Sequence, residues 1–169
     1  MELKEAFLKR RSVRKFTKDV VSDDEIAYLL HAAMSGPSAM NNKPWEFYVI
    51  TNKDKLEQLK TASQYTGYDA PLAIVVAGDL SRALPEPMKE FWVQDCCSAT
   101  ENILLAATDL GLGSVWCGIY PMDKAVNNVQ KILGVTSDVL PLNIIYIGHP
   151  NVEVESRDQF DLRNVHFYN

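Results

Sequence analysis

A cluster of basic residues near the N-terminus is the first feature of the sequence that could bind a ligand. Residues 10–16 read Arg-Arg-Ser-Val-Arg-Lys-Phe, which places four cations and one hydroxyl within six residues. Guanidinium groups are planar and can bind two phosphate oxygens at once, and the hydroxyl of Ser12 adds a directional hydrogen bond. The segment therefore predicts a phosphate-binding site. A solvated basic end of a helix is the alternative that these residues alone leave open.

A second candidate segment combines small side chains with two amides. Residues 36–44 read Gly-Pro-Ser-Ala-Met-Asn-Asn-Lys-Pro and lead into residues 45–50, Trp-Glu-Phe-Tyr-Val-Ile. The aromatic and β-branched residues of the second stretch are typical of a strand, so the first is a loop. A loop of small residues can approach a ligand closely, whereas Asn41 could instead cap a turn.

The composition limits the classes of protein to which the chain could belong. Its length of 169 residues is most simply one domain, residues 1–169. The net charge of −5 argues against nucleic acid as the main partner, because duplex binding needs a broad basic face. The first residues lack the apolar core of a signal peptide, and no apolar run reaches the ~18 residues of a membrane span. We therefore expect neither a nucleic-acid nor a membrane partner.

Cysteine and histidine residues give further expectations. Cys96, Cys97 and Cys117 are odd in number and form no Cys-x-x-Cys pair, which fits a reducing cytoplasm. Cys117 lies beside Gly118, and a cysteine in a strand is more often a small buried hydrophobe than a redox thiol. The three histidines lie far apart and lack the spacing of metal ligands, so we expect no metal site.

Hydrophobic patterns predict the elements that must position these segments. The expected helices are residues 2–10, 23–35, 53–64, 88–110 and 122–133, and the expected strands are residues 45–50, 71–77, 115–118 and 142–147. The first helix ends at the basic cluster. The nearly continuous apolar run of residues 71–77 predicts a strand buried on both faces. Helices and strands alternate irregularly, without a repeat or linker, which is typical of a single α+β domain.

Two further stretches suggest contacts with another subunit. The predicted helix 88–110 is apolar over too wide an arc for a surface helix, so it could serve both a core and a subunit interface. Its small residues, such as Ser98 and Ala99, would permit close helix packing. The tail after Pro150 is long and polar with scattered aromatics. A segment of this kind is expected to lie along a partner or a sheet edge.

Four motifs in order along the chain resemble the FMN-dependent nitroreductase family, of which this would be a short, single-domain member. They are Arg-x-Ser-x-Arg-x-Phe at residues 10–16, Pro-Ser-x-x-Asn-x-x-Pro-Trp at residues 37–45, Gly-Leu-Gly at residues 111–113 and Ile-Gly-His-Pro at residues 147–150. The resemblance implies an α+β fold with a central mixed β-sheet flanked by helices. It also implies a homodimer with two flavin sites at the subunit interface and an extended C-terminal tail that reaches the partner subunit.

The resemblance assigns cofactor-binding roles to ten residues. Phosphate, ribityl and the pyrimidine edge of FMN would be held by Arg10, Arg11, Ser12 and Arg14, with Arg157 as a late phosphate-binding arginine. The isoalloxazine ring would be reached from the other subunit by Pro37, Ser38, Ala39 and Asn41, and Gly118 would lie against the ring. Two positions depart from the family pattern. Lys43 replaces the usual glutamine and could add charge near the cofactor, but a long cation on a loop is expected to point to solvent. Glu155 stands where larger members tend to have lysine.

The predicted function follows from this likeness. The chain would take a hydride from NADH or NADPH and reduce a small acceptor, nitroaromatic or quinone-like, by a ping-pong mechanism. A negative charge that builds near N1 and O2 of the flavin would be stabilised by Arg14. Flavin hydride transfer needs no protein nucleophile, so we expect no catalytic side chain and interpret Asp95 as a hydrogen-bonded structural acid. A non-catalytic protein that stores or senses FMN is the alternative.

Overall fold

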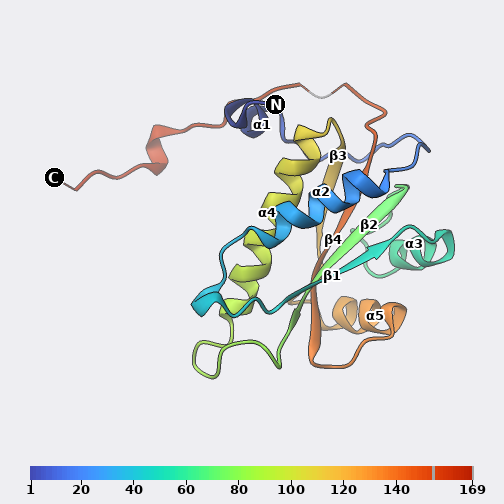
Figure 1. The fold of residues 1–169 in the computed structure, drawn as a ribbon, viewed down its shortest axis with the longest axis vertical. Coiled ribbons are helices and arrows are strands. Elements are labelled where there is room, and N and C mark those ends of the chain that lie inside the picture. The colour runs from blue at the N-terminus through green and yellow to red at the C-terminus, as the bar shows by residue number, and fades with distance from the viewer. Residues whose placement is uncertain (154, 169) are drawn as a thin grey trace.

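A four-stranded antiparallel sheet organises the computed structural model, which describes residues 1–153 and 155–168. The strands follow the spatial order β1-β2-β4-β3 (Figure 1). Their bounds are Trp45–Ile50 for β1, Leu72–Asp79 for β2, Gly113–Gly118 for β3 and Val139–Gly148 for β4. The α-helices are α1 (Leu3–Lys9), α2 (Asp23–Met34), α3 (Lys53–Lys60), α4 (Phe91–Asp109) and α5 (Asp123–Leu133), and the 3-10 helices are η1 (Ala39–Asn41) and η2 (Leu162–Asn164).

The expectation of a mixed sheet is wrong, because every pairing between these strands is antiparallel. The order of the strands explains the difference. β2 and β3 run in the same direction and are joined through α4, as in a parallel crossover unit. However, β4 lies between them and runs opposite to both, as in the pairs Val75 with Ile144 and Trp116 with Ile145.

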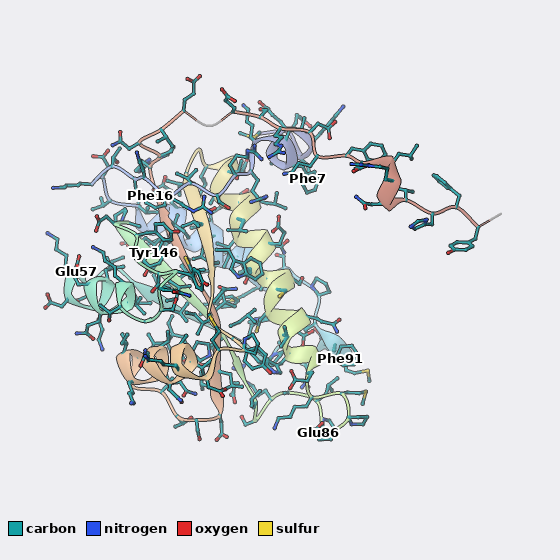
Figure 2. All side chains as sticks on the ribbon, turned by 180° about the vertical axis from the view of Figure 1, so that it is seen from behind. Phe7, Phe16, Glu57, Glu86, Phe91 and Tyr146 are labelled. Atoms are coloured by element: carbon teal, nitrogen blue, oxygen red, sulfur yellow. The ribbon has the colours of Figure 1, made fainter. Side chains whose placement is uncertain are left out.

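Helices cover both faces of the sheet. Figure 1 shows α2 and α4 on one face and α3 and α5 on the other. Alternate residues of β2 enter the two cores: Ile74 packs with the α2 and α4 cluster, and Val75 packs with the α3 and α5 cluster. Burial of β2 on both faces is therefore confirmed. Tyr146 of β4, which Figure 2 labels, lies in the core formed with α3 and α5. Its hydroxyl donates to the carbonyl of Thr66 at 2.8 Å.

The ends of the helices can be compared with those predicted from local sequence signals. α2 begins with a capping box between Ser22 and Glu25, and α5 ends at Gly134, which is left-handed with φ of 72°. α3 is shorter than predicted, because the Thr66 hydroxyl bonds the carbonyls of Lys60 and Ser63 in a turn that replaces further helix. α4 begins at Phe91, three residues later than predicted.

Close packing of α2 on α4 positions the second candidate loop. Gly36 follows α2, and a Cβ at this position would lie 2.8 Å from Ser98 Oγ and 3.3 Å from the backbone nitrogen of Ala99. The turn after α2 therefore lies directly against Ser98 and Ala99 of α4, whereas a role of these small residues at a subunit interface stays a prediction. In the described part of the chain, no helix is long and apolar enough to cross a membrane.

Candidate functional site

The basic segment 10–16 is held in place by Val13. Val13 is buried, and its backbone N–H donates to the carbonyl of Ser114 in β3 at 2.9 Å. Gly113 permits this approach, because a Cβ there would lie 2.7 Å from the Val13 side chain. The chain is extended here, so neighbouring residues point away from the buried one. Ser12 and Arg14, on either side of Val13, are accordingly exposed.

A surface cleft of about 450 Å³ lies along this segment. Its lining consists of Arg11, Ser12, Val13, Arg14, Lys15, Val152, Glu153 and Glu155. Three cations and one hydroxyl could therefore bind an anion such as phosphate. The two carboxylates of the tail reduce the net positive charge of the cleft but leave the cations in excess. The structure thus brings together three of the predicted cofactor residues, Arg11, Ser12 and Arg14.

Arg10 and Arg157 are close in sequence to the lining residues Arg11 and Glu155, but neither is part of the lining. Arg10 Nε lies 3.6 Å from Glu101 Oε1 on α4, so its charge already faces a carboxylate. Arg157 is exposed, and its backbone N–H donates to the carbonyl of Leu8 at 3.0 Å. The tail therefore returns to the end of α1, and Arg157 is brought to the same end of the molecule as the basic segment.

The loop of residues 36–44 occupies a different part of the molecule. Figure 1 shows η1 beside the start of α4, whereas α1 lies beside the end of the same helix. The backbone N–H of Ala39 donates to Asp95 Oδ1 at 2.8 Å, so Asp95 is hydrogen-bonded, as expected. Within residues 1–153 and 155–168, the lining of the cleft includes none of the four predicted loop residues, which are Pro37, Ser38, Ala39 and Asn41.

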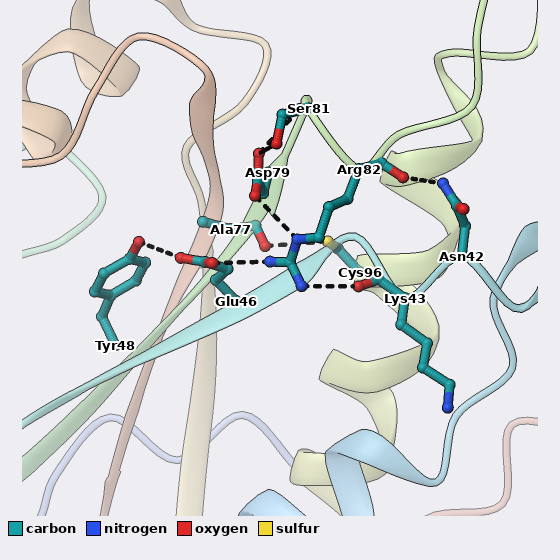
Figure 3. Close-up of polar contacts among 9 residues, drawn as sticks. All are labelled: Asn42, Lys43, Glu46, Tyr48, Ala77, Asp79, Ser81, Arg82 and Cys96. Carbon is teal, nitrogen blue, oxygen red and sulfur yellow. Dashed lines mark hydrogen bonds and ion pairs between the residues drawn. The ribbon is translucent and has the colours of Figure 1, made fainter.

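Lys43 ends this loop with its side chain in solvent, as expected. It is exposed and has φ of 50°. Its carbonyl accepts a hydrogen bond from Arg82 Nη1 at 3.3 Å, while its ammonium group points away from the polar network in Figure 3. Sequence reasoning did not single out Arg82, since its partner lies 39 residues earlier and no local pattern connects the two.

Gly118 and Cys117 end β3 with opposite surroundings. Gly118 is exposed, and a Cβ added there would meet no atom of the described residues within 4 Å. Cys117 is buried, and desolvation raises the pKa of its thiol to about 11, although the charge of Arg14 opposes this shift. The thiol is therefore neutral near pH 7, which supports its interpretation as a small buried hydrophobe.

Comparison with known proteins connects this geometry to a family. The model of the nitroreductase family matches residues 7–64 and 57–149. A protein of Methanothermobacter thermautotrophicus, provisionally named NADH dehydrogenase/NAD(P)H nitroreductase, is 40% identical over 168 residues, which cover 98% of this chain and 86% of the relative.

Two solved structures share the fold. An FMN-dependent nitroreductase of Clostridium difficile has a TM-score of 0.88 and 31% identity, and the match covers 98% of this chain and 99% of the other. A provisionally named nitroreductase of Desulfovibrio desulfuricans in complex with FMN has a TM-score of 0.82 and 27% identity, with 100% and 97% of the chains covered. The chain belongs to the nitroreductase family of NAD(P)H- and flavin-dependent oxidoreductases.

Proposed function

We propose that the protein is an FMN-dependent enzyme that takes a hydride from NADH or NADPH and reduces a small nitroaromatic or quinone-like molecule. The observation that carries the proposal is the cationic cleft in which Arg11, Ser12 and Arg14 meet. A relative of the same fold has been solved with FMN. FMN, when bound, supplies the transfer of reducing equivalents between the two substrates.

The residues of the cleft have two proposed roles, which are binding of the phosphate and stabilisation of charge on the ring. Arg11 and Ser12 offer a guanidinium fork and a hydroxyl to the phosphate end of FMN, with Arg10 and Arg157 nearby at the end of α1. Arg14 is the cation that would stabilise negative charge at the pyrimidine edge of the ring. No side chain has to serve as a nucleophile, and the proposed site contains no catalytic residue of that kind.

We also propose that each site is completed by a second copy of the chain. Within one chain, the loop 36–44 and the basic segment lie beside different ends of α4 (Figure 1). Pro37, Ser38, Ala39 and Asn41 would therefore reach the ring from the partner, and Gly118 would provide the open surface against which the ring lies.

The tail supports the same assembly. It extends from the body of the molecule (Figure 1), and Phe160 and Phe167 are 75% and 76% exposed in the single chain. Large exposed apolar side chains of this kind mark an interaction surface. We infer that the tail lies on the partner subunit and that the homodimer is a cytoplasmic enzyme, the latter because its three cysteines are free.

The proposal is tested by titrating the purified protein with FMN and then adding NADH or NADPH without oxygen. We expect one FMN per chain, loss of the flavin absorbance band at ~450 nm on adding a nucleotide, and its return on adding an acceptor. Initial rates at several acceptor concentrations should give the parallel double-reciprocal lines of a ping-pong mechanism. Failure to bind FMN would contradict the proposal, and binding without reduction would favour an FMN store or sensor.

A further inference from the structure

The loop between α2 and β1 has an unfavourable backbone conformation. Met40, Asn41 and Lys43 have φ values of 52°, 56° and 50°, which lie in the left-handed region. Glycine enters this region freely and asparagine tolerates it, but other residues suffer a clash between Cβ and the backbone. The segment 38–43 must therefore be held by its surroundings, and such strain is concentrated at binding and catalytic sites.

Hydrogen bonds hold this segment at both ends. At its start, Asp95 Oδ1 accepts from the Ala39 N–H at 2.8 Å, and Asp95 is buried on α4. Across the loop, Ser38 Oγ accepts from the Lys43 N–H at 3.0 Å. At its end, Arg82 Nη1 donates to the Lys43 carbonyl at 3.3 Å, and the Asn42 side-chain amide donates to the Arg82 carbonyl.

Arg82 is itself fixed by two carboxylates (Figure 3). Its Nε donates to Asp79 Oδ2 at 2.9 Å, and its Nη2 donates to Glu46 Oε1 at 2.8 Å. The other oxygen of Glu46 accepts from the hydroxyl of Tyr48 at 2.6 Å. All three nitrogen atoms of one planar guanidinium therefore donate hydrogen bonds at once. A lysine ammonium cannot reproduce this planar arrangement of donors because it is a compact point charge.

This arrangement connects the loop to the two strands that flank it. Glu46 lies in β1, immediately after the loop, and Asp79 ends β2, the neighbouring strand. Arg82 thus ties the carbonyl of Lys43 to rigid elements of the sheet. Surface ion pairs usually contribute little, but a guanidinium shared among several fixed acceptors restricts the geometry of the segment that it touches.

We propose that Arg82 is a positioning residue that holds the loop 38–43 in the conformation that receives FMN. The inference rests on the proposed function, since it assumes that Ser38, Ala39 and Asn41 reach the flavin. Arg82 acts through the Lys43 carbonyl and, in this proposal, does not touch the cofactor. Its carboxylate partners set the position of the guanidinium, so a cation of another shape at this position would let the loop relax.

The test compares Arg82→Lys and Arg82→Met with the wild type and with Lys60→Met. Lys60 is a suitable control because its ammonium also pairs with two carboxylates, Glu57 and Asp69, but on α3. Three quantities are measured: the dissociation constant of FMN, the visible circular-dichroism spectrum of bound FMN, and hydrogen exchange of the Ala39 and Lys43 amides in the FMN-free protein.

We expect both Arg82 variants to bind FMN roughly tenfold more weakly, the size of effect that follows loss of one hydrogen bond from a charged donor. The flavin circular dichroism should change, and the two loop amides should exchange faster, with exchange elsewhere unchanged. Lys60→Met should match the wild type in all three measurements.

Three results would overturn the inference. In the first, an Arg82 variant binds FMN as tightly as the wild type. In the second, exchange increases throughout the fold, which would show a general structural role. In the third, Lys60→Met has the same effects as the Arg82 variants. A wild-type protein that binds no FMN would instead overturn the proposed function, and the inference with it, so the two failures are distinguishable.

Discussion

Asp95 Oδ1 accepts a hydrogen bond from the backbone N–H of Ala39 at 2.8 Å, which joins α4 to the loop that precedes β1. The carboxyl is buried, and desolvation raises its pKa, while the Ala39 hydrogen bond partly opposes this shift. The folded chain therefore binds this proton more tightly than the unfolded chain does. The contribution of Asp95 to stability is complete below its ordinary pKa of 3.8 and is lost as the pH rises through the raised value.

Asp95→Asn should remove this part of the pH dependence. The asparagine carbonyl can still accept from the Ala39 N–H, and it carries no charge to desolvate. We expect the variant to gain stability relative to the wild type as the pH rises from below the ordinary pKa of 3.8 through the raised pKa of Asp95. Urea unfolding of both proteins at fixed concentration measures the difference. A stability difference that stays constant across this range would contradict the assignment.

Gly118→Ala should lower FMN affinity with little effect on the stability of the fold. The new methyl group meets no atom of the described chain within 4 Å, so the free energy of unfolding without FMN should change by less than about 1 kcal/mol. FMN affinity should fall, because the methyl occupies the surface proposed for the ring. Calorimetric titration measures this, and unchanged affinity would remove Gly118 from the proposed site.

Gly78→Ala provides the contrasting control. A Cβ at Gly78 would lie 2.4 Å from Cε3 of the buried Trp92, so this variant should lose about 1–3 kcal/mol of stability even without ligand. Thermal unfolding of the two alanine variants distinguishes a glycine required by packing from one proposed to face a ligand.

Arg14→Ala and Arg10→Ala should differ in their effects. Both should weaken FMN binding, but Arg14 lines the cleft, whereas Arg10 Nε lies 3.6 Å from Glu101 Oε1. Loss of Arg14 removes the cation proposed to stabilise negative charge on the ring, so the flavin midpoint potential should become more negative in this variant. Spectroelectrochemical titration tests this, and equal potentials in the two variants would contradict the role given to Arg14.

Thr100→Val should disturb a buried polar pair beneath α4. Asn143 Nδ2 donates to Thr100 Oγ1 at 2.9 Å, and Asn143 Oδ1 has no hydrogen-bond partner among the described residues. Removing the hydroxyl leaves the amide nitrogen unpaired as well, which should cost about 1–3 kcal/mol. Adding Asn143→Leu should recover part of that loss. Urea unfolding of the two single variants and the double variant gives the coupling, and strictly additive losses would contradict it.

Replacing Phe160 and Phe167 together with serine should weaken the proposed dimer. Both side chains are mostly exposed in the single chain, so their loss should cost a monomer little stability. Sedimentation across a range of protein concentrations measures the dissociation constant. An unchanged constant would show that the apolar side chains of the tail do not contribute to the subunit interface.

Local signals explain what the sequence could predict. The capping box at Ser22 and the glycine at position 134 are encoded within a few residues, and the helices that they bound were predicted to within two residues. The nearly continuous apolar run that forms β2 also predicted a strand buried on both faces. The resemblance assigned cofactor-binding roles to residues of the basic cluster, and three of them, Arg11, Ser12 and Arg14, line one cleft.

Contacts between residues distant in the sequence explain what the sequence could not predict. The direction of each strand relative to its neighbours depends on where β4 inserts, which no local pattern records. The contact of Arg82 with Lys43 likewise joins residues 39 positions apart. The ion pair of Arg10 with Glu101 of α4 depends on how two separate helices pack, so the sequence could not show that Arg10 already faces a carboxylate.

The place of β4 in the sheet has a consequence for how the chain folds. β4 is the last strand to be synthesised, yet it pairs with both β2 and β3. Until residues 139–148 are available, each of those strands keeps an unpaired edge, and such edges are prone to aggregation. The centre of the sheet also depends on contacts between distant residues, such as Leu72 with Ile147, which slow folding. Truncation before β4 should therefore yield aggregating chains rather than a smaller stable domain.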